Sequence, residues 1–498
     1  MRILHLDIDA LRPDHLGCYG YHRDTSPTID TIAKDAVRFE EVYCSDAPCL
    51  PSRTALYSGR FGFDTGVTDH GHTHGQPRLE PRRNARDLFT IDGLPGRLAR
   101  AGYRTVLISG FHARHSAHWF AAGFTETIDT RKGGMEIVSD VQPHAESWLR
   151  EHADEEDWYL HVNYWDVHTP YRTPMDYGHP FENEPLPGYV DDALIERWKN
   201  KVGPHSPKDV GRMFDDVTGD HPRDVGRCDT MDGARKAIDG YDTAIRYVDD
   251  AIAKLMAILD DLGVADDTAI VITADHGENM GELGIWGEHA TADAATCHIP
   301  LIVKWPGKKP GVHAGLQYHL DWSATVLDLL GMEPSGSADG KSFAGVFDGE
   351  DPPGREALVF SQGSHTCQRS VRWNDGNRKW LHIQSYHDGY HLFPDDMLFD
   401  LADDPYEQSD IAVHHADVVD RAKAVASEWV EARQKKLMAR GVEPTDPLVT
   451  TVAEGGPFYC RNWWITKGDA LPYYLDRLEK TGRAEGAAKL REKYTSRA

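Results

Sequence analysis

Short apolar runs alternate with longer helical patterns over most of the chain. Within 234–262 the apolar residues Ile238, Tyr241, Ala244, Ile245, Val248, Ile252 and Leu255 recur at helical spacing. Strands that alternate with helices are typical of βαβ units in a parallel sheet. The sequence therefore predicts an α/β fold. The apolar runs of strand length lie at 2–9, 39–43, 104–109, 158–164 and 269–273.

The pattern changes near residue 355, where short strands follow one another without helices between them. Asn374-Asp375-Gly376 is typical of a hairpin turn between the second and third of them. An amphipathic helix is expected at 415–438, and further helices in the last fifty residues. We therefore expect a catalytic domain at 1–354, a C-terminal subdomain with a small antiparallel sheet and a helix at 355–445, and a helical extension at 446–498.

Composition narrows the function classes. With 40% hydrophobic and 27% charged residues, the 498-residue chain is typical of a soluble globular protein. A net charge of −26 argues against a nucleic-acid partner. The first residues, MRILHLDIDALRPD, lack the apolar core of a signal peptide, and no stretch approaches the ~18 apolar residues of a membrane span. Seven widely spaced cysteines fit reduced thiols. We expect a cytoplasmic protein with no membrane contact.

Cys49 is the candidate reactive centre. It stands in Cys49-Leu50-Pro51-Ser52-Arg53, where Pro and Ser favour the start of a helix. The side chain is thus expected at the positive end of a helix dipole, which stabilises anions. The alternative interpretation is a buried structural cysteine.

Carboxylates follow two of the expected strands. Asp7 and Asp9 share one face at the end of the first strand, and Asp275-His276 follows the strand at 269–273. Open α/β folds place their sites at this carboxyl edge of the sheet. Oxygen ligands with one imidazole suit Ca²⁺, Mg²⁺ or Mn²⁺. We expect Asp9 to be a ligand, with Asp7 as the alternative.

The motif around Cys49 resembles the signature of the type I sulfatases, in the alkaline phosphatase superfamily. The resemblance rests on Cys-x-Pro-Ser-Arg, followed by Leu56, Ser58 and Gly59-Arg60, and extends to a C-terminal segment at 398–411. It implies an alkaline-phosphatase-like sandwich, in which a large mixed, mostly parallel sheet lies between helices, plus a small C-terminal α+β subdomain. It also implies that a formylglycine-generating enzyme oxidises Cys49 to formylglycine, whose hydrate is the nucleophile.

The resemblance also implies roles for other residues. The metal ligands would be Asp9, the oxidised Cys49, Asp275 and His276, with Ca²⁺ expected and Mg²⁺ or Mn²⁺ as alternatives. Arg53 would hold the hydrate, and His112 would be the base that releases sulfate. His168, in His168-Thr169-Pro170-Tyr171, would protonate the leaving oxygen. Lys304 would neutralise the sulfate, and His289 is a weaker candidate nearby.

Two positions depart from the family pattern. Ala10 stands where the second of two adjacent Asp residues is usual, and Gly110 stands where a Lys is usual. Arg114 or His115 is expected to replace the missing cation. His70, in a loop rich in Gly and His, either faces the substrate or is exposed to solvent. The related phosphonate and phosphodiester hydrolases also lack the second Asp.

Three functions follow. The first is metal-dependent hydrolysis of a sulfate ester, in a small molecule or an oligosaccharide, with a sulfated carbohydrate as the expected substrate. The second is hydrolysis of a phosphonate monoester or phosphodiester at the same site. The third is a non-catalytic protein that binds a metal or a sulfate ester and keeps Cys49 unmodified. The sequence does not decide whether the protein forms a homo-oligomer or what role Trp463 and Trp464 have.

Overall fold

The protein is built around one large sheet. The computed structural model describes residues 1–78, 90–210, 221–333, 335–458 and 470–495 of the chain, so Trp463 and Trp464 lie outside the described residues. The sheet has nine strands in the order β11-β2-β10-β7-β1-β6-β4-β5, with β12 paired to β2. The strands are β1 (Arg2–Ile8), β2 (Val37–Tyr43), β4 (Arg104–Ile108), β5 (Glu126–Ile128), β6 (Trp158–Tyr164), β7 (Thr268–Thr273), β10 (His298–Lys304), β11 (Gly311–His313) and β12 (Gln317–Tyr318).

Strand direction decides which residues meet at the site. β1 pairs in parallel with β6 and β7, and β4 with β6, so these strands end at the same edge. Among the nine strands, β10 alone runs antiparallel to its neighbours β7 and β2. The carboxyl edge therefore receives the ends of β1, β2, β4, β6 and β7 together with the beginning of β10.

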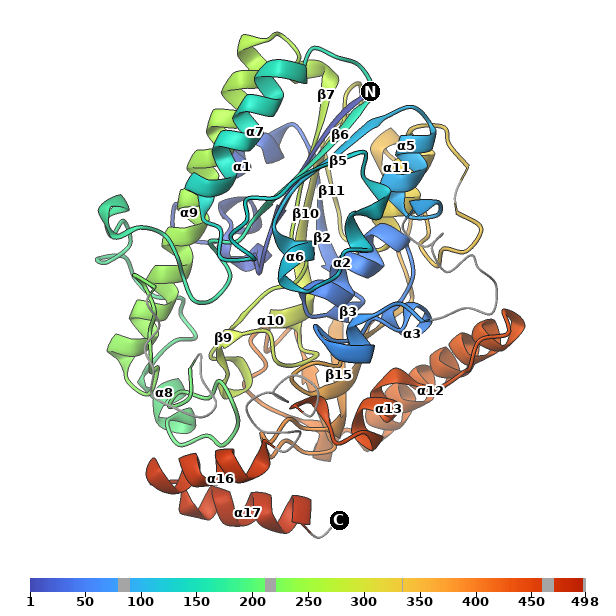
Figure 1. Ribbon diagram of the computed structural model, residues 1–498. Helices are drawn as coiled ribbons and strands as arrows, with labels where there is room; N and C mark the ends of the chain where they lie inside the picture. Colours follow the sequence, from blue (N-terminus) through green and yellow to red (C-terminus); the bar gives the residue numbers. More distant parts are fainter. Residues whose placement is uncertain (79–89, 211–220, 334, 459–469, 496–498) are drawn as a thin grey trace.

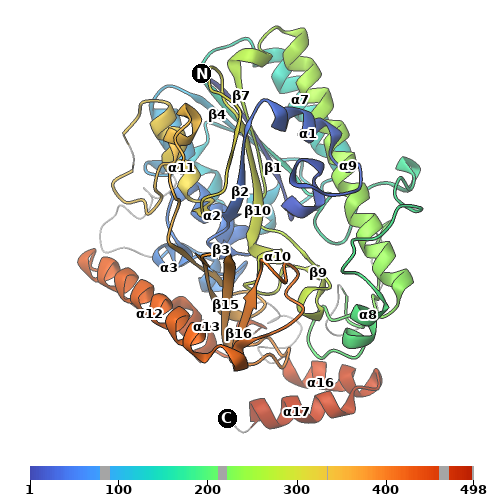
Figure 2. The same ribbon diagram turned by 180° about the vertical axis from the view of Figure 1, so that it is seen from behind.

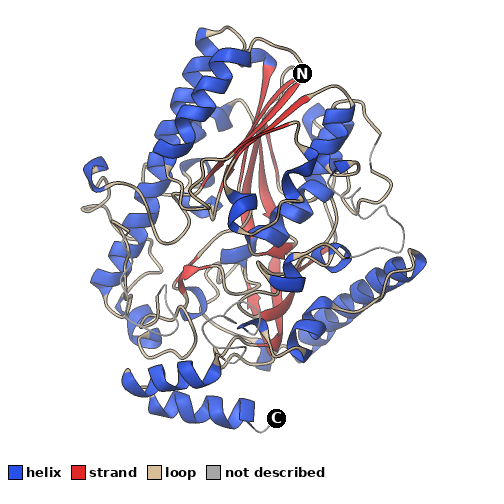
Figure 3. Cartoon of the chain, in the orientation of Figure 1, coloured by secondary structure: helices blue, strands red, loops and turns tan. Residues whose placement is uncertain are grey.

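Helices cover both faces of the sheet (Figures 1 and 3). One side carries α1 (Pro27–Lys34), α7 (Val138–His152) and α9 (Met231–Asp261), and the other carries α2 (Cys49–Ser58), α5 (Leu94–Arg100) and α11 (Asp321–Leu329). Every residue of β6 and β7 is buried between the layers. The α/β sandwich expected from the sequence is confirmed. The long helix begins earlier than its apolar pattern, because Thr230 accepts a hydrogen bond from the Gly233 N–H and caps it.

A second sheet lies beyond the carboxyl edge, in the order β16-β15-β14-β13-β3 (Figure 2). Its strands are β3 (Asp46–Ala47), β13 (Ala357–Gln362), β14 (Cys367–Asp375), β15 (Arg378–His387) and β16 (Asp396–Asp400). β14 and β15 form the hairpin expected at Asn374-Asp375-Gly376. β3 immediately precedes the helix that begins at Cys49, so this sheet is joined directly to the reactive segment. The domain boundaries at 354 and 445 stay a prediction.

The remaining elements surround these two sheets. α12 (Ala416–Ala439) and α13 (Pro447–Ala453) contact β14, and α16 (Leu471–Lys480) and α17 (Ala484–Thr495) form a helical pair near the C-terminus (Figure 2). In the described part of the chain no helix is long and apolar enough to cross a membrane. The short elements are α3 (Gly62–Thr65), α6 (Phe111–Arg114), α8 (Asp192–Trp198), α10 (Ala294–Cys297), β8 (Asn279–Met280) and β9 (Trp286–Glu288).

Candidate active site

Cys49 is the first residue of α2 and is almost completely buried at the carboxyl edge of the main sheet. β2 and β3 deliver the chain to this point, and the helix N-terminus directs its free N–H groups toward the site. Burial, together with the carboxylates of Asp9 and Asp275, raises the pKa of the Cys49 thiol well above its usual range. The sulfur is therefore held as a neutral thiol, which is a weak nucleophile.

Three carboxylates surround one guanidinium beside Cys49, and we call Asp7, Asp9 and Asp275 the carboxylate group. Arg53 lies one helical turn after Cys49. Its Nε and Nη2 donate to the two oxygens of Asp7 at 2.6 and 3.1 Å. Its Nη1 donates to Asp9 Oδ2 at 2.9 Å and to Asp275 Oδ2 at 2.7 Å. All four side chains are buried.

The charges of this group do not balance. Burial opposes ionisation of Asp7, but Arg53 and His161 hold its pKa below the usual range. Burial, with Asp9 and Asp7 nearby, raises the pKa of Asp275 well above its usual range although Arg53 opposes the shift. One guanidinium thus serves three carboxylates, which leaves two negative charges when all are ionised. A divalent cation is the charge that would balance them.

The residues expected to bind the metal lie together. One ligand atom each from Asp9, Cys49, Asp275 and His276 falls within 4.8 Å of the others, and all four residues are buried. Asp9 Oδ1 is buried without a hydrogen-bond partner. An orphaned carboxylate oxygen in a ligand set of mostly oxygen fits a hard divalent cation. Both oxygens of Asp7 accept hydrogen bonds from Arg53, whereas Asp9 has one oxygen left for a metal ion. The geometry therefore favours Asp9 over Asp7 as the ligand.

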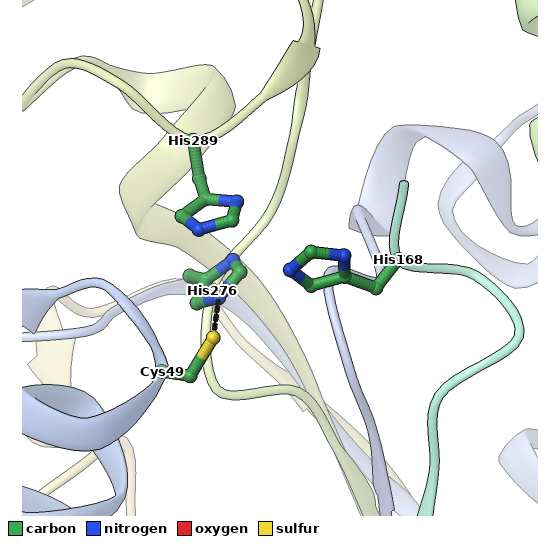
Figure 4. A group of neighbouring side chains, drawn as sticks. All are labelled: Cys49, His168, His276 and His289. Carbon is green, nitrogen blue, oxygen red and sulfur yellow. Dashed lines mark hydrogen bonds between the residues drawn. The ribbon is translucent and has the colours of Figure 1, made fainter. Parts of the chain in front are cut away.

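Three imidazoles lie near Cys49, and we call His168, His276 and His289 the imidazole group (Figure 4). Cys49 Sγ lies 3.1 Å from His276 Nε2. The His276 and His289 rings stack with centroids 4.0 Å apart, and the His168 ring lies 5.0 Å from that of His289. Burial, followed by the charges of His289, Arg114 and Arg172, lowers the pKa of His168 well below its usual range.

Of the residues expected to contact substrate, His70 and His115 meet Cys49. Their ring centroids are 4.5 Å apart, and one donor atom of each lies within 4.8 Å of the Cys49 sulfur. Arg114 stacks on Trp165, with the guanidinium carbon 4.8 Å from the ring centroid, and donates to the Gly134 carbonyl. Its positive charge lowers the pKa of the Cys49 thiol, against the larger raising effects of burial and of Asp9 and Asp275. The loop with His70 therefore faces the site and is not a solvent-exposed rim.

One expected residue lies elsewhere. Lys304 is the last residue of β10, and because that strand is antiparallel, Lys304 pairs with Ile270 at the opposite end of the sheet. Its Nζ lies 3.9 Å from the exposed Asp266. The expectation that Lys304 neutralises the sulfate is therefore wrong. His289, which precedes β10 in the chain, is the residue of this segment that reaches the site.

His112 is not in the groups of potential ligand atoms that the structure gathers at Cys49 in the described residues, whereas His115, three residues later, is. His112 lies in the single turn of α6, half-buried beside His118, with ring centroids 6.4 Å apart, and its pKa is lowered by burial while Asp129 raises it. A base at His112 stays a prediction, and His115 is a second candidate beside Cys49.

Sequence reasoning missed several buried groups beside the imidazole group. Arg172 is buried, donates to the Trp165 carbonyl at 3.1 Å, and leaves its Nε without a partner. Glu288 Oε1 lies 3.0 Å from His289 Nδ1, and its two oxygens lie 3.4 and 3.6 Å from His205 and His365. These residues come from loops far apart in sequence. No spacing along the chain links them. Arg172 alone could have been found from the sequence, because it directly follows the His168-Thr169-Pro170-Tyr171 segment that was expected at the site.

The model of the family named Sulfatase matches residues 3–332. The chain belongs to the sulfatase family. Sulfatases hydrolyse sulfate esters, so this protein is a sulfuric ester hydrolase. The match covers all of the strand ends that form the site.

Individual relatives are distant. The chain is 25% identical over 448 residues to choline-sulfatase of Rhizobium meliloti, covering 80% of each chain. It is 27% identical over 350 residues to human iduronate 2-sulfatase, covering 62% of this chain and 60% of the other. Among solved structures, BT4656 in complex with its substrate D-glucosamine-2-N,6-O-disulfate matches with a TM-score of 0.68 and 17% identity, over 86% of this chain and 97% of the other. The phosphonate monoester hydrolase of Agrobacterium radiobacter matches with a TM-score of 0.67 and 20% identity, over 87% and 95%. At these identities, the structural matches establish the fold alone.

Proposed function

We propose that this sulfatase hydrolyses a sulfated carbohydrate with formylglycine, made from Cys49, as the source of its nucleophile. The observation that carries the proposal is the position of Cys49 Sγ, at a helix N-terminus between the carboxylate group and the imidazole group. A thiol held neutral there is poorly suited to attack. As its hydrate, formylglycine supplies one hydroxyl that attacks sulfur and a second whose deprotonation later expels sulfate.

The residues around position 49 divide the remaining work. A divalent cation held by Asp9, Asp275, His276 and the side chain at 49, with Ca²⁺ expected first, would favour the ionised form of a hydroxyl that it binds. Arg53 holds the three carboxylates in place through four hydrogen bonds and holds the pKa of Asp7 below its usual range. His168 and His115 both lie beside Cys49, and we assign proton transfer to the leaving ester oxygen to His168 and proton removal from the second hydroxyl to His115. The negative charge of a bound sulfate ester would offset the burial and the nearby cations that lower the pKa of His168. His289 offers an N–H to a sulfuryl oxygen in the place expected for Lys304.

A carbohydrate substrate is supported by the names of relatives and by the site itself. An N-acetylglucosamine-6-O-sulfatase of Bacteroides thetaiotaomicron is 22% identical over 474 residues. Arg114 and Arg172 add positive charge beside His168. In the described residues neither of them forms an ion pair with a carboxylate, so both remain available to an anionic sugar.

The second candidate is a phosphonate monoester or phosphodiester hydrolase. It is favoured by Ala10, which lacks the second carboxylate, and by the likeness to the Agrobacterium radiobacter enzyme. Purified protein would be assayed with matched aryl sulfate and aryl phosphonate esters. We expect a higher kcat/KM on the sulfate; a preference for the phosphonate by tenfold or more would reverse the proposal.

The nucleophile is tested by mass spectrometry of the tryptic peptide 39–53, from protein made together with a formylglycine-generating enzyme. We expect a loss of about 18 Da at Cys49, the change from thiol to aldehyde that this chemistry requires. The same peptide contains Cys44, which is an internal control and should keep its thiol. Active protein whose Cys49 is wholly unmodified would refute the proposed nucleophile.

A further inference from the structure

The imidazole group and Cys49 together form a second set of metal ligands that overlaps the first. One ligand atom each from Cys49, His168, His276 and His289 lies within 4.8 Å of the others, and all four residues are buried. In Figure 4 the His276 ring lies against the sulfur, the His289 ring lies beyond it and the His168 ring lies to one side. This set has three nitrogens and one sulfur, whereas the set with Asp9 and Asp275 is mostly oxygen.

Two of the three rings have one nitrogen engaged away from the sulfur. His168 Nδ1 bonds to the Thr169 carbonyl, and His276 Nδ1 lies 2.8 Å from the Gly277 carbonyl. In these two rings the acceptor at Nδ1 places the proton there and leaves the Nε2 lone pair for a metal, which is the usual support of a ligating histidine. His289 Nδ1 lies 3.0 Å from Glu288 Oε1 without a hydrogen bond to it.

The ligand types select the metal. Thiolate and imidazole ligands in a four-coordinate set favour Zn²⁺, while carboxylates favour Ca²⁺ and Mg²⁺. We propose that, as long as residue 49 is a cysteine, the protein binds Zn²⁺ through Cys49, His168, His276 and His289. On binding, the S–H bond breaks, a Zn–S bond forms, and the thiol proton passes to the buffer, with no change of oxidation state.

The chemical state of residue 49 then selects the metal of the site. Oxidation of Cys49 removes the one sulfur ligand and puts an oxygen beside Asp9 and Asp275, so the balance of ligands moves toward the oxygen-rich set, which favours Ca²⁺ or Mg²⁺. This last step rests on the proposed function; zinc binding by the thiol form does not.

The test uses full-length protein from a host that lacks the modifying enzyme, with the Cys49 thiol verified by peptide mass. The metal-free protein is titrated with Co²⁺, which reports a tetrahedral site by its visible absorption and a thiolate ligand by a charge-transfer band. We expect one equivalent to bind with both signals, and Zn²⁺ to displace it. Cys49→Ser should lose the charge-transfer band and at least tenfold in Zn²⁺ affinity, and His289→Ala should lose at least tenfold in affinity.

Matched controls separate the possible results. Cys18→Ser, which removes a thiol outside the site, should bind as the parent does. Protein carrying the aldehyde should lack the charge-transfer band. The inference is overturned if the parent shows no charge-transfer band, or if Cys49→Ser binds Zn²⁺ as tightly as the parent does. Because no step of this test uses turnover, its failure leaves the sulfatase proposal standing, and inactive oxidised protein would leave zinc binding standing.

Discussion

The two groups that flank Cys49 are built in different ways. The carboxylate group lies at or directly after the ends of two paired strands, β1 and β7, and is held by four hydrogen bonds from Arg53. The imidazole group stands on loops after β6, β7 and β9, and its rings are held mainly by neighbouring backbone carbonyls. One group is thus fixed by the sheet and the signature helix, and the other by loops that fold over them. We infer that the carboxylate group provides a rigid base for a metal ion, whereas the imidazole group supplies nitrogen atoms on loops that different sequences could reposition.

The residue between the two groups gives the largest expected effect. Cys49→Ala should lower the hydrolysis of an aryl sulfate by at least ~10³-fold, since losing a covalent nucleophile removes the main route of the reaction. The measurement is kcat/KM, with circular dichroism to show that the fold is kept. Activity within tenfold of the parent would mean that neither group acts through Cys49, and the non-catalytic interpretation of this residue would return.

Removing the guanidinium tests whether the carboxylate group depends on it. Arg53→Met leaves three buried carboxylates without their cation, so we expect the free energy of unfolding to fall by about 3–5 kcal/mol in urea denaturation. Arg421→Met is the control, because the Arg421–Asp375 pair is exposed and should matter by about 0–1 kcal/mol. Equal effects of the two variants would show that the group is solvated or balanced in another way.

The imidazole group is tested by comparing His289 with Lys304, which follows it in the same segment of the chain. His289→Ala should lower kcat/KM by ~10²-fold, the usual cost of one donor to a developing charge. Lys304→Ala should stay within about twofold, because it lies at the far end of β10 and touches no group of the site. A large loss with Lys304→Ala and none with His289→Ala would return Lys304 to the site and contradict the antiparallel direction of β10.

The sequence predicts the carboxylate group better than it predicts the loops that carry the imidazole group. Asp9, Cys49, Asp275 and His276 were all expected, because strand ends and a helix start can be located from local patterns. Lys304 was misplaced because an apolar run carries no sign of strand direction. His112 came from the family resemblance alone, and no local pattern in the single turn of α6 shows that His115 lies beside Cys49. Arg172 and Glu288 were missed because their partners come from distant loops.

A buried carboxylate outside the site shows what Arg53 contributes. Asp249 accepts hydrogen bonds from the Thr28 and Ile29 N–H groups at 2.9 and 2.8 Å, and burial raises its pKa from 3.8 to about 6. Asp7, equally buried but held by Arg53, is shifted the other way. The folded protein therefore binds more protons at Asp249 than the unfolded chain does between pH 4 and 6.

The pH dependence of stability follows from that difference. The contribution of Asp249 is fully present below pH 3.8 and is lost as the pH rises through about 6, by at most about 1.4 kcal/mol per pH unit. Asp249→Asn does not ionise, so the parent should lose roughly 2 kcal/mol relative to this variant between pH 4 and 7 in urea denaturation. A constant difference across this range would mean that Asp249 ionises freely in the fold. Asp249 and Asp7 would then not differ in pKa through the lack of hydrogen bonds from a guanidinium to Asp249, and the special role given to Arg53 would fail.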